Sequence, residues 1–236
     1  MADPERLESA GPAARVRRIL SERGIPAPRP EEPEVDAVPE WLRARRRELA
    51  LTRWESATPL RYRRAWITEP AALAWADRVL ADFTSAGALL LTGPTGTGKT
   101  HEAYGALHYI ADAGPPRYEV ITTNSADLYG ALRPTATTGS TEHELRRFAS
   151  VPLLLVDDLG SAKTSEWTEE ITFRLIDHRY NHCLPTLLTS NLPARSAGGP
   201  DLNDVLGERV TSRLAEMTTV VAMVGEDRRR AQKTTG

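Results

Sequence analysis

The sequence is poor in cysteine, in lysine and in long apolar runs, and each shortage excludes a class of protein. Cys183 is the only cysteine among the 236 residues, which excludes an internal disulfide and any zinc site built on several cysteines. No apolar run approaches the roughly 20 residues of a membrane-spanning helix, and the first ten residues lack the basic start and apolar block of a secretion signal. We therefore expect a soluble, cytoplasmic protein with no membrane partner.

Positive charge is carried almost entirely by arginine. Lys99, Lys163 and Lys233 are the only lysines among the 30 basic residues. The formal net charge of −2 argues against a protein that coats duplex DNA through charge alone. A content of 40% hydrophobic and 26% charged residues is that of an ordinary globular chain, which predicts a real core and excludes wholesale disorder.

Composition divides the chain into three parts. Residues 1–57 predict a small helical and proline-rich extension that is a candidate for docking a partner. Residues 58–230 predict the main domain, and residues 231–236 a flexible tail. The arginine-rich stretch 41–64 leaves two interpretations open, since it either docks a polyanion or forms a solvated helix face. In the second case its apolar residues pack on the neighbouring domain; these are Trp41, Leu42, Leu49 and Trp54.

Helical and strand-like segments alternate after residue 58, which predicts an α/β fold with a central parallel sheet of five strands. The run Leu153–Val156 does not alternate with polar residues, as is typical of a strand covered by helices on both faces. The pattern therefore predicts a three-layer α/β/α domain, with helices that include Thr100–Ala113 and Asp201–Met217. The predicted strands are Ala88–Leu91, Tyr118–Ile121, Leu153–Val156, Thr186–Leu188 and Val220–Val224.

The segment Gly93–Thr100 fits the pattern G-x-x-x-x-G-K-[ST] between a predicted strand and a predicted helix, the context that this motif requires. Its glycines let backbone N–H groups surround phosphate oxygens, and the following helix adds the positive end of its dipole. We expect Lys99 to reach the β and γ phosphates of ATP and the Thr100 hydroxyl to ligate Mg²⁺. The predicted nucleotide contacts are Gly93, Pro94, Thr95, Gly96, Thr97, Gly98, Lys99, Thr100 and His101.

Two aspartates directly follow the run Leu153–Val156 and so lie at the C-terminal end of a predicted strand. Ligands bind at that edge in open α/β sheets. We expect Asp157 to hold Mg²⁺, mostly through water, and Asp158 to orient or deprotonate the attacking water. An acidic residue after the metal aspartate favours a water-activating ATPase over a nucleotide kinase. The alternative is a pair of aspartates that cap a turn or a helix.

Further candidate residues stand later in the chain. Asn191 follows the next apolar run and is placed to hydrogen-bond the γ-phosphate or the lytic water, with a simple turn cap as the alternative. Arg209 and Arg213 are four residues apart in a predicted helix, so they share a face that can address the phosphates of a neighbouring subunit. An ordinary pair of surface arginines is the alternative. The basic cluster at Arg228–Arg230 has a charged tail as its default interpretation.

Taken together, these motifs resemble those of the DnaC/IstB-like AAA+ ATPases. The resemblance runs from about residue 59 to residue 230, and the family includes loaders of the bacterial replicative helicase, their phage counterparts and transposition helper proteins. The more discriminating part is the Thr-Ser-Asn ending followed by Gly-Glu-Arg-x-x-Ser-Arg-Leu. The matching segments are Gly93–Thr100, Leu153–Gly160, Thr189–Asn191, Gly207–Leu214 and Gly225–Arg229.

The resemblance implies a P-loop AAA+ domain without a large lid and assigns roles to several residues. Asn191 is the sensor-1 residue by this comparison. Arg213 is the first candidate for an arginine finger and Arg209 the second, and either Arg228 or Arg229 takes the sensor-2 position. A finger that acts in trans implies a homo-oligomer joined through its ATP sites.

The function implied by the resemblance is ATP-dependent loading of a replicative helicase onto single-stranded DNA, with ATP and Mg²⁺ as cofactors. Arg133, Arg146 and Arg147 are the candidate DNA contacts, with a solvated helix face as the alternative. Many loaders carry a cysteine-rich zinc module near the N-terminus, which this sequence lacks. Three other functions stay open, namely a transposition helper that binds duplex DNA, a small-molecule kinase and a module that binds ATP without hydrolysing it.

Overall fold

The structure is a computed structural model of the whole chain, and it describes residues 38–133, 141–196 and 198–225. The chain divides into two compact units, Met1–Pro39 and Glu40–Gly236. The first unit lies almost entirely outside the described residues, as does the predicted tail 231–236. Within the described ranges, no helix combines the length and the apolar character that a membrane span requires.

The second unit begins with helix α2 (Glu40–Ala57), earlier in the chain than the boundary at residue 57 that composition suggests. One side of α2 is fixed to the core, because Trp54 is buried and its Nε1 donates to the Tyr104 carbonyl at 3.3 Å. Of the other apolar residues expected to pack, Leu42 is half-buried, whereas Trp41 and Leu49 are exposed. Two arginines of α2 also contact the domain, since Arg47 donates to Asp112 Oδ1 at 3.0 Å and Arg53 to the Tyr118 carbonyl at 2.7 Å.

The described elements alternate between helix and strand, as the sequence predicts. The five strands form one parallel sheet in the order β2-β3-β4-β1-β5. In chain order the further elements are η2 (Leu60–Tyr62), α3 (Pro70–Ala81), β1 (Ala88–Thr92), α4 (Lys99–Asp112), β2 (Val120–Asn124), α5 (Ser125–Leu132), α6 (Thr141–Ser150), β3 (Leu153–Asp157), α7 (Glu166–Asn181), β4 (Thr186–Ser190), α8 (Leu202–Leu206), α9 (Glu208–Met217) and β5 (Thr218–Ala222).

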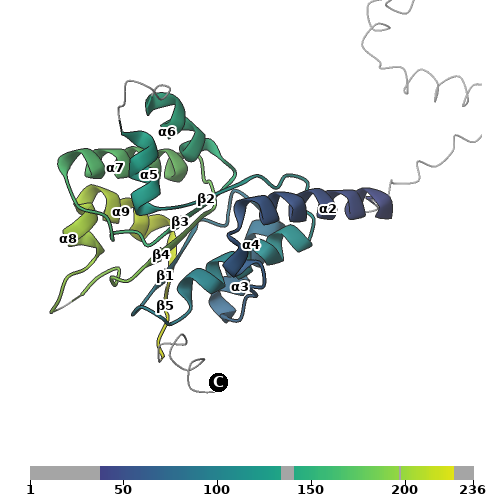
Figure 1. Cartoon of the computed structure of the whole chain (residues 1–236), viewed down its shortest axis with the longest axis horizontal. Coiled ribbons are helices and arrows are strands. Elements are labelled where there is room, and N and C mark those ends of the chain that lie inside the picture. Colours follow the sequence, from purple (N-terminus) through teal and green to yellow (C-terminus); the bar gives the residue numbers. More distant parts are fainter. Residues whose placement is uncertain (1–37, 134–140, 197, 226–236) are drawn as a thin grey trace, which may run out of the picture. The chain divides into compact units, whose positions relative to one another are not determined.

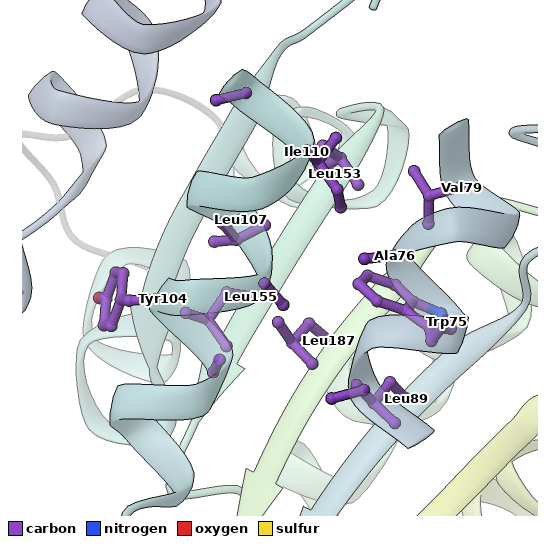
Figure 2. Close-up of a cluster of buried hydrophobic side chains, with 14 of the residues drawn as sticks. Trp75, Ala76, Val79, Leu89, Tyr104, Leu107, Ile110, Leu153, Leu155 and Leu187 are labelled. Carbon is purple, nitrogen blue, oxygen red and sulfur yellow. The ribbon is translucent and has the colours of Figure 1, made fainter. Parts of the chain in front are cut away.

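Helices cover both faces of the sheet, with α2, α3 and α4 on one side and α5 to α9 on the other (Figure 1). Alternate residues of a single strand enter the two cores. In β1, Leu89 and Leu91 pack with α3 and α4, while Leu90 packs toward α7. Figure 2 shows the first of these cores, in which Trp75 of α3 lies over Leu89 and Leu187 of the sheet. Burial on both faces explains why the strand sequences are apolar without alternation.

The helix predicted over residues 201–217 is in fact two helices. Gly207 separates α8 from α9 with φ of +80° and ψ of 160°, which is not a helical conformation. This positive φ is a conformation that residues with a side chain rarely adopt, which favours glycine at the break. Asp201 caps α8 by accepting hydrogen bonds from the backbone N–H groups of Asn203 and Asp204. The helical periodicity continues across this break, which is why the sequence pattern does not show it.

A fully buried arginine of α7 links that helix to α6 and to the strands β3 and β4. Arg179 of α7 is 0% exposed, and burial lowers the pKa of its guanidinium to about 9, so it stays charged at neutral pH. Its N–H groups donate to the carbonyl oxygens of Phe148, Ala149, Val151, Pro152 and Pro185 and to the hydroxyl of Thr186. These bonds tie the end of α6 to the starts of β3 and β4, whose other ends carry the candidate site.

Candidate functional site

The loop Gly93–Gly98 runs from the end of β1 to the start of α4, as the motif predicts. Gly93 has φ of +141°, and a Cβ there would lie 2.1 Å from the Met223 carbonyl oxygen of the adjacent segment. Gly98 has φ of +99° and is the residue that precedes α4. Glycine is therefore required at both ends of the loop. The loop leads into the N-terminus of α4, where backbone N–H groups without helical partners can bind an anion.

Lys99 is the first residue of α4 and is only 6% exposed. Its Nζ donates to the carbonyl oxygens of Gly93 and Pro94, at 2.7 and 2.8 Å, and to Asn191 Oδ1 at 2.9 Å. β4 pairs with β1 in parallel, and this register places Asn191 directly beside the loop. The loop, its lysine and the predicted sensor-1 residue thus form one hydrogen-bonded group.

Asp157 at the end of β3 is the second group of the site. The Thr100 hydroxyl lies 3.0 Å from Asp157 Oδ1, and the Thr189 hydroxyl donates to the same oxygen at 2.6 Å. Burial raises the pKa of this carboxyl; the Thr189 hydrogen bond opposes that effect, and the negative charge of Asp158 adds to it. A hydroxyl and a carboxylate at this spacing fit Mg²⁺, which takes one or two protein oxygens and completes its shell with water and phosphate oxygens.

Asp158 adopts a left-handed backbone conformation with φ of +53°, which is uncommon for a residue other than glycine. Its neighbours hold it there, because its N–H donates to the Thr189 hydroxyl at 2.9 Å and its carbonyl accepts from the Ser125 hydroxyl at 3.0 Å. Asn191 Nδ2 donates to Asp158 Oδ1 at 3.3 Å. The strained turn therefore brings the second carboxylate within hydrogen-bond reach of Asn191, the predicted sensor-1 residue.

These groups line one open cleft of about 760 Å³, a volume suited to a nucleotide-sized ligand. Residues of the phosphate loop, the two aspartates and Asn191 contribute to its lining. Four further lining residues come from the segment before α3 and had not been assigned to the nucleotide site from the sequence: Arg61, Tyr62, Arg64 and Trp66. The only signal in the sequence was the density of arginine before residue 64. Ser125, whose hydroxyl donates to the Asp158 carbonyl, was also missed, and Thr189 was noted only as part of the Thr-Ser-Asn ending, without a role in positioning the aspartates.

The two candidate finger arginines lie on α9 and do not line this cleft. Arg213 is held within its own chain, with Nε donating to Asp177 Oδ1 at 3.1 Å and the guanidinium 4.7 Å from the Tyr180 ring centre. Arg209 lies 3.8 Å from the Phe173 ring centre, and its side chain is 65% exposed. Arg213, the first candidate for the finger, therefore has the stronger contacts within its own chain.

The predicted DNA contacts lie apart from the cleft, around α5 and α6. Arg133 is exposed directly after α5. On α6, Arg146 lies 3.5 Å from Glu142 and Arg147 lies 3.6 Å from Glu144, so the positive charge is partly balanced. The two sensor-2 candidates, Arg228 and Arg229, lie outside the described residues, as does the stretch 134–140 between α5 and α6.

Residues 67–236 match the model of the IstB-like ATP-binding protein family. The chain belongs to this family. It is 30% identical over 145 residues to an ATP-binding protein of insertion sequence IS5376 from Geobacillus stearothermophilus. This match covers 61% of this chain and 56% of that protein. It is 29% identical over 143 residues to the replicative helicase loader DnaC of Buchnera aphidicola, covering 59% and 55%. The chain thus spans about half the length of these curated relatives.

Solved structures of DnaC, DnaI and DnaA share the fold. A crystal structure of the DnaC helicase loader superimposes with a TM-score of 0.59 at 26% identity, covering 70% of this chain and all of that one. A DnaI crystal structure gives the same TM-score at 21% identity over 75% of this chain and 99% of that one. The replication initiator DnaA, solved with AMPPCP and single-stranded DNA, gives 0.58 at 22% identity over 71% and 51%. The described domain is therefore an ATP-binding AAA+ domain of the P-loop class.

Proposed function

We propose that this protein binds ATP with Mg²⁺ and hydrolyses it. The observation that carries the proposal is the 3.0 Å contact between Thr100 of the phosphate loop and Asp157 at the end of β3. It joins the motif that binds phosphate to a carboxylate suited to a metal. Asp158 and Asn191 then lie on the same side of the cleft, where the terminal phosphate of a nucleotide on the loop would lie.

The roles of the residues follow from these contacts. Lys99 neutralises charge on the β and γ phosphates, and Thr100 and Asp157 hold Mg²⁺, which when bound offsets the negative charge of the phosphate chain. Asp158 accepts a proton from the attacking water or orients it, because its carboxylate has no ion pair within the described part of the chain and faces the Asn191 amide. Asn191 hydrogen-bonds the γ-phosphate or that water.

We infer that a second copy of the chain completes the site and that Arg209 is the residue it supplies. An arginine that reaches a neighbour's phosphates must be free to leave its own surface. Arg209 is 65% exposed, and it is held only by the Phe173 ring and a distant carboxylate at 3.9 Å, whereas Arg213 has a close ion pair with Asp177. This reverses the order of preference that the family resemblance gave.

A direct test compares ATP binding and phosphate release for the wild-type protein and for the Lys99→Ala variant, with and without EDTA. Lys163→Ala is the matched control, because Lys163 is an exposed lysine outside the cleft. We expect Lys99→Ala to weaken ATP binding by at least about 100-fold, since it removes charge-assisted bonds to phosphate. Unchanged ATP binding in Lys99→Ala would refute the site. Phosphate release that EDTA does not affect would refute the role of the metal.

For the biological role we propose the loading of a replicative helicase onto single-stranded DNA. Its support is the DnaC structure, all of which matches 70% of this chain at 26% identity. In this proposal the N-terminal part of the chain engages the helicase in the cytoplasm. DNA is contacted beside α5 and α6 by the three arginines that the sequence predicted for this role, namely Arg133, Arg146 and Arg147.

A second candidate role, that of a transposition helper on duplex DNA, is favoured by the family model and by the relative from insertion sequence IS5376. Native mass spectrometry with the host replicative helicase, in ATP and in ADP, separates the two roles. A nucleotide-dependent complex of fixed stoichiometry supports the loader. No complex, together with ATP turnover stimulated by duplex DNA, would replace it with the transposition helper.

A further inference from the structure

The segment of residues 58–69 between α2 and α3, here called the connector, crosses the first turns of the helix that follows the phosphate loop. A buried carboxylate fastens it there. Glu102 of α4 is 0% exposed and accepts hydrogen bonds from the backbone N–H groups of Thr68 at 2.8 Å and Glu69 at 3.1 Å, and from the Thr68 hydroxyl. Because Glu102 stands three residues after Lys99, the connector is tied to the phosphate-binding turn itself.

Two further contacts fix the path of the connector over α4. A Cβ at Gly105 would lie 2.4 Å from the Trp66 carbonyl carbon, so the two backbones approach as closely as glycine alone permits. The Tyr62 ring stacks on the ring of Tyr104, with centres 4.9 Å apart and planes at 8°. The connector is therefore a rigid wall of the cleft, and its side chains start from defined positions.

This wall presents two arginines to the cleft and keeps a third away from it. Arg61 and Arg64 are exposed and line the cleft together with Lys99 and the two aspartates. Neither has a hydrogen bond or an ion pair within the described ranges of the chain. Arg63, which lies between them in sequence, donates instead to the carbonyl oxygens of Glu55 at 3.2 Å and Thr58 at 3.5 Å, outside the cleft lining.

The charge distribution of the cleft indicates what these two arginines bind. Guanidinium groups without partners beside a loop of phosphate-binding N–H groups create a positive field that favours a highly charged anion. The guanidinium also matches phosphate oxygens in a two-point geometry that an ammonium group cannot form. A polyphosphate that enters the cleft would therefore meet both the loop and this pair, which line the same cleft.

We propose that Arg61 and Arg64 bind the phosphate chain of ATP in the same subunit, from the connector side of the cleft, and so favour the triphosphate over the diphosphate. The inference rests on the proposed ATP-binding function. It makes the connector, which leads directly from α2, a part of the nucleotide site.

The test measures the affinity of the full chain for Mg-ATP and Mg-ADP by calorimetry, for Arg61→Ala, Arg64→Ala and the double variant. Arg63→Ala is the control, since it removes an arginine of the same segment that faces away. We expect each cleft variant to weaken ATP binding by about 10-fold, the double variant by more, and ADP binding by less. Arg61→Lys and Arg64→Lys should recover only part of the loss. Arg63→Ala should bind both nucleotides as the wild type does.

The outcomes separate this inference from the function on which it rests. Wild-type protein that fails to bind ATP would refute the proposed function. Wild-type protein that binds ATP, with a double variant that binds ATP equally well, would overturn the inference alone. A single-stranded oligonucleotide provides the last arm, because a double variant that loses oligonucleotide binding and keeps ATP binding would assign the two arginines to nucleic acid instead. Thermal unfolding of each variant checks that these exposed substitutions leave the fold intact.

Discussion

The arginine pair of α9 and the arginine pair of the connector differ in the way they are held. Arg213 is bound to Asp177 and lies over Tyr180, and Arg209 lies over Phe173, so aromatic rings of α7 support both. Arg61 and Arg64 project into the cleft from a rigid backbone with no protein partner within the described residues. Spacing in the sequence located the first pair and overlooked the second. The comparison teaches that spacing identifies a shared face, whereas the availability of an arginine depends on partners that only the fold brings near.

The largest effect that would sharpen this comparison is expected for Arg209→Ala. If Arg209 completes a neighbour's site, its loss should lower the rate of ATP turnover by about 10³- to 10⁵-fold, as for arginine fingers in other phosphoryl-transfer systems. ATP affinity should stay within about twofold, because the residue lies outside the cleft of its own chain. Steady-state phosphate release and equilibrium binding measure the two quantities. Full turnover in this variant would remove Arg209 from the mechanism.

The next effect concerns the carboxylate on the phosphate-loop side of the cleft. Asp158→Asn keeps the shape of the side chain but removes the base, so turnover should fall by about 10²- to 10⁴-fold while Mg-ATP still binds. Asparagine also tolerates a positive φ, so the turn at this position should persist. A single-turnover assay with excess enzyme isolates the chemical step. Unchanged turnover would return Asp158 to a structural role.

A third effect contrasts a buried arginine with an exposed one on the same helix. Arg179→Met removes six hydrogen bonds and leaves buried carbonyls without donors, so the free energy of unfolding should fall by about 3–5 kcal/mol. Arg174→Met removes an exposed pair with Glu142 and should cost less than about 1 kcal/mol. Chemical denaturation compares the two variants. Equal losses would mean that the Arg179 network contributes little.

The smallest effect is expected for Arg213→Ala. Its ion pair with Asp177 is about one-third exposed on both sides, so its loss should lower the free energy of unfolding by about 1 kcal/mol or less. Turnover should fall less than 10-fold, in contrast with the Arg209 variant. The same denaturation and phosphate-release assays apply. A collapse of turnover in Arg213→Ala with normal activity in Arg209→Ala would restore the opposite order.

Much of the fold was predictable because its signals are local. The apolar runs located all five strands to within a few residues, and the phosphate-loop motif located Lys99 and Thr100 with their context. The break at Gly207 was not predicted because apolar periodicity continues through it, and the positive φ that favours glycine there is seen only in the fold. The packing of α2 stayed open between two interpretations, because a helix rich in arginine looks solvated until Trp54 is seen against α4.

The site was predictable wherever a residue acts through its own motif. Asp157 and Asp158 follow a strand, so their position at the sheet edge is given by topology. The roles of Glu102 and of Arg61 depend instead on contacts between segments more than 30 residues apart in the chain. A short motif cannot encode such contacts, since they arise from the crossing of the connector over α4.

The measurement that tests the account most directly is ATP turnover in mixtures of Lys99→Ala and Arg209→Ala subunits, each inactive alone. The first variant lacks a working phosphate loop but retains Arg209, and the second binds ATP but lacks the arginine. If a second copy completes each site, mixing should restore turnover, with a maximum near equal amounts of the two subunits. Turnover in the mixture no higher than the sum of the separate variants would contradict the account.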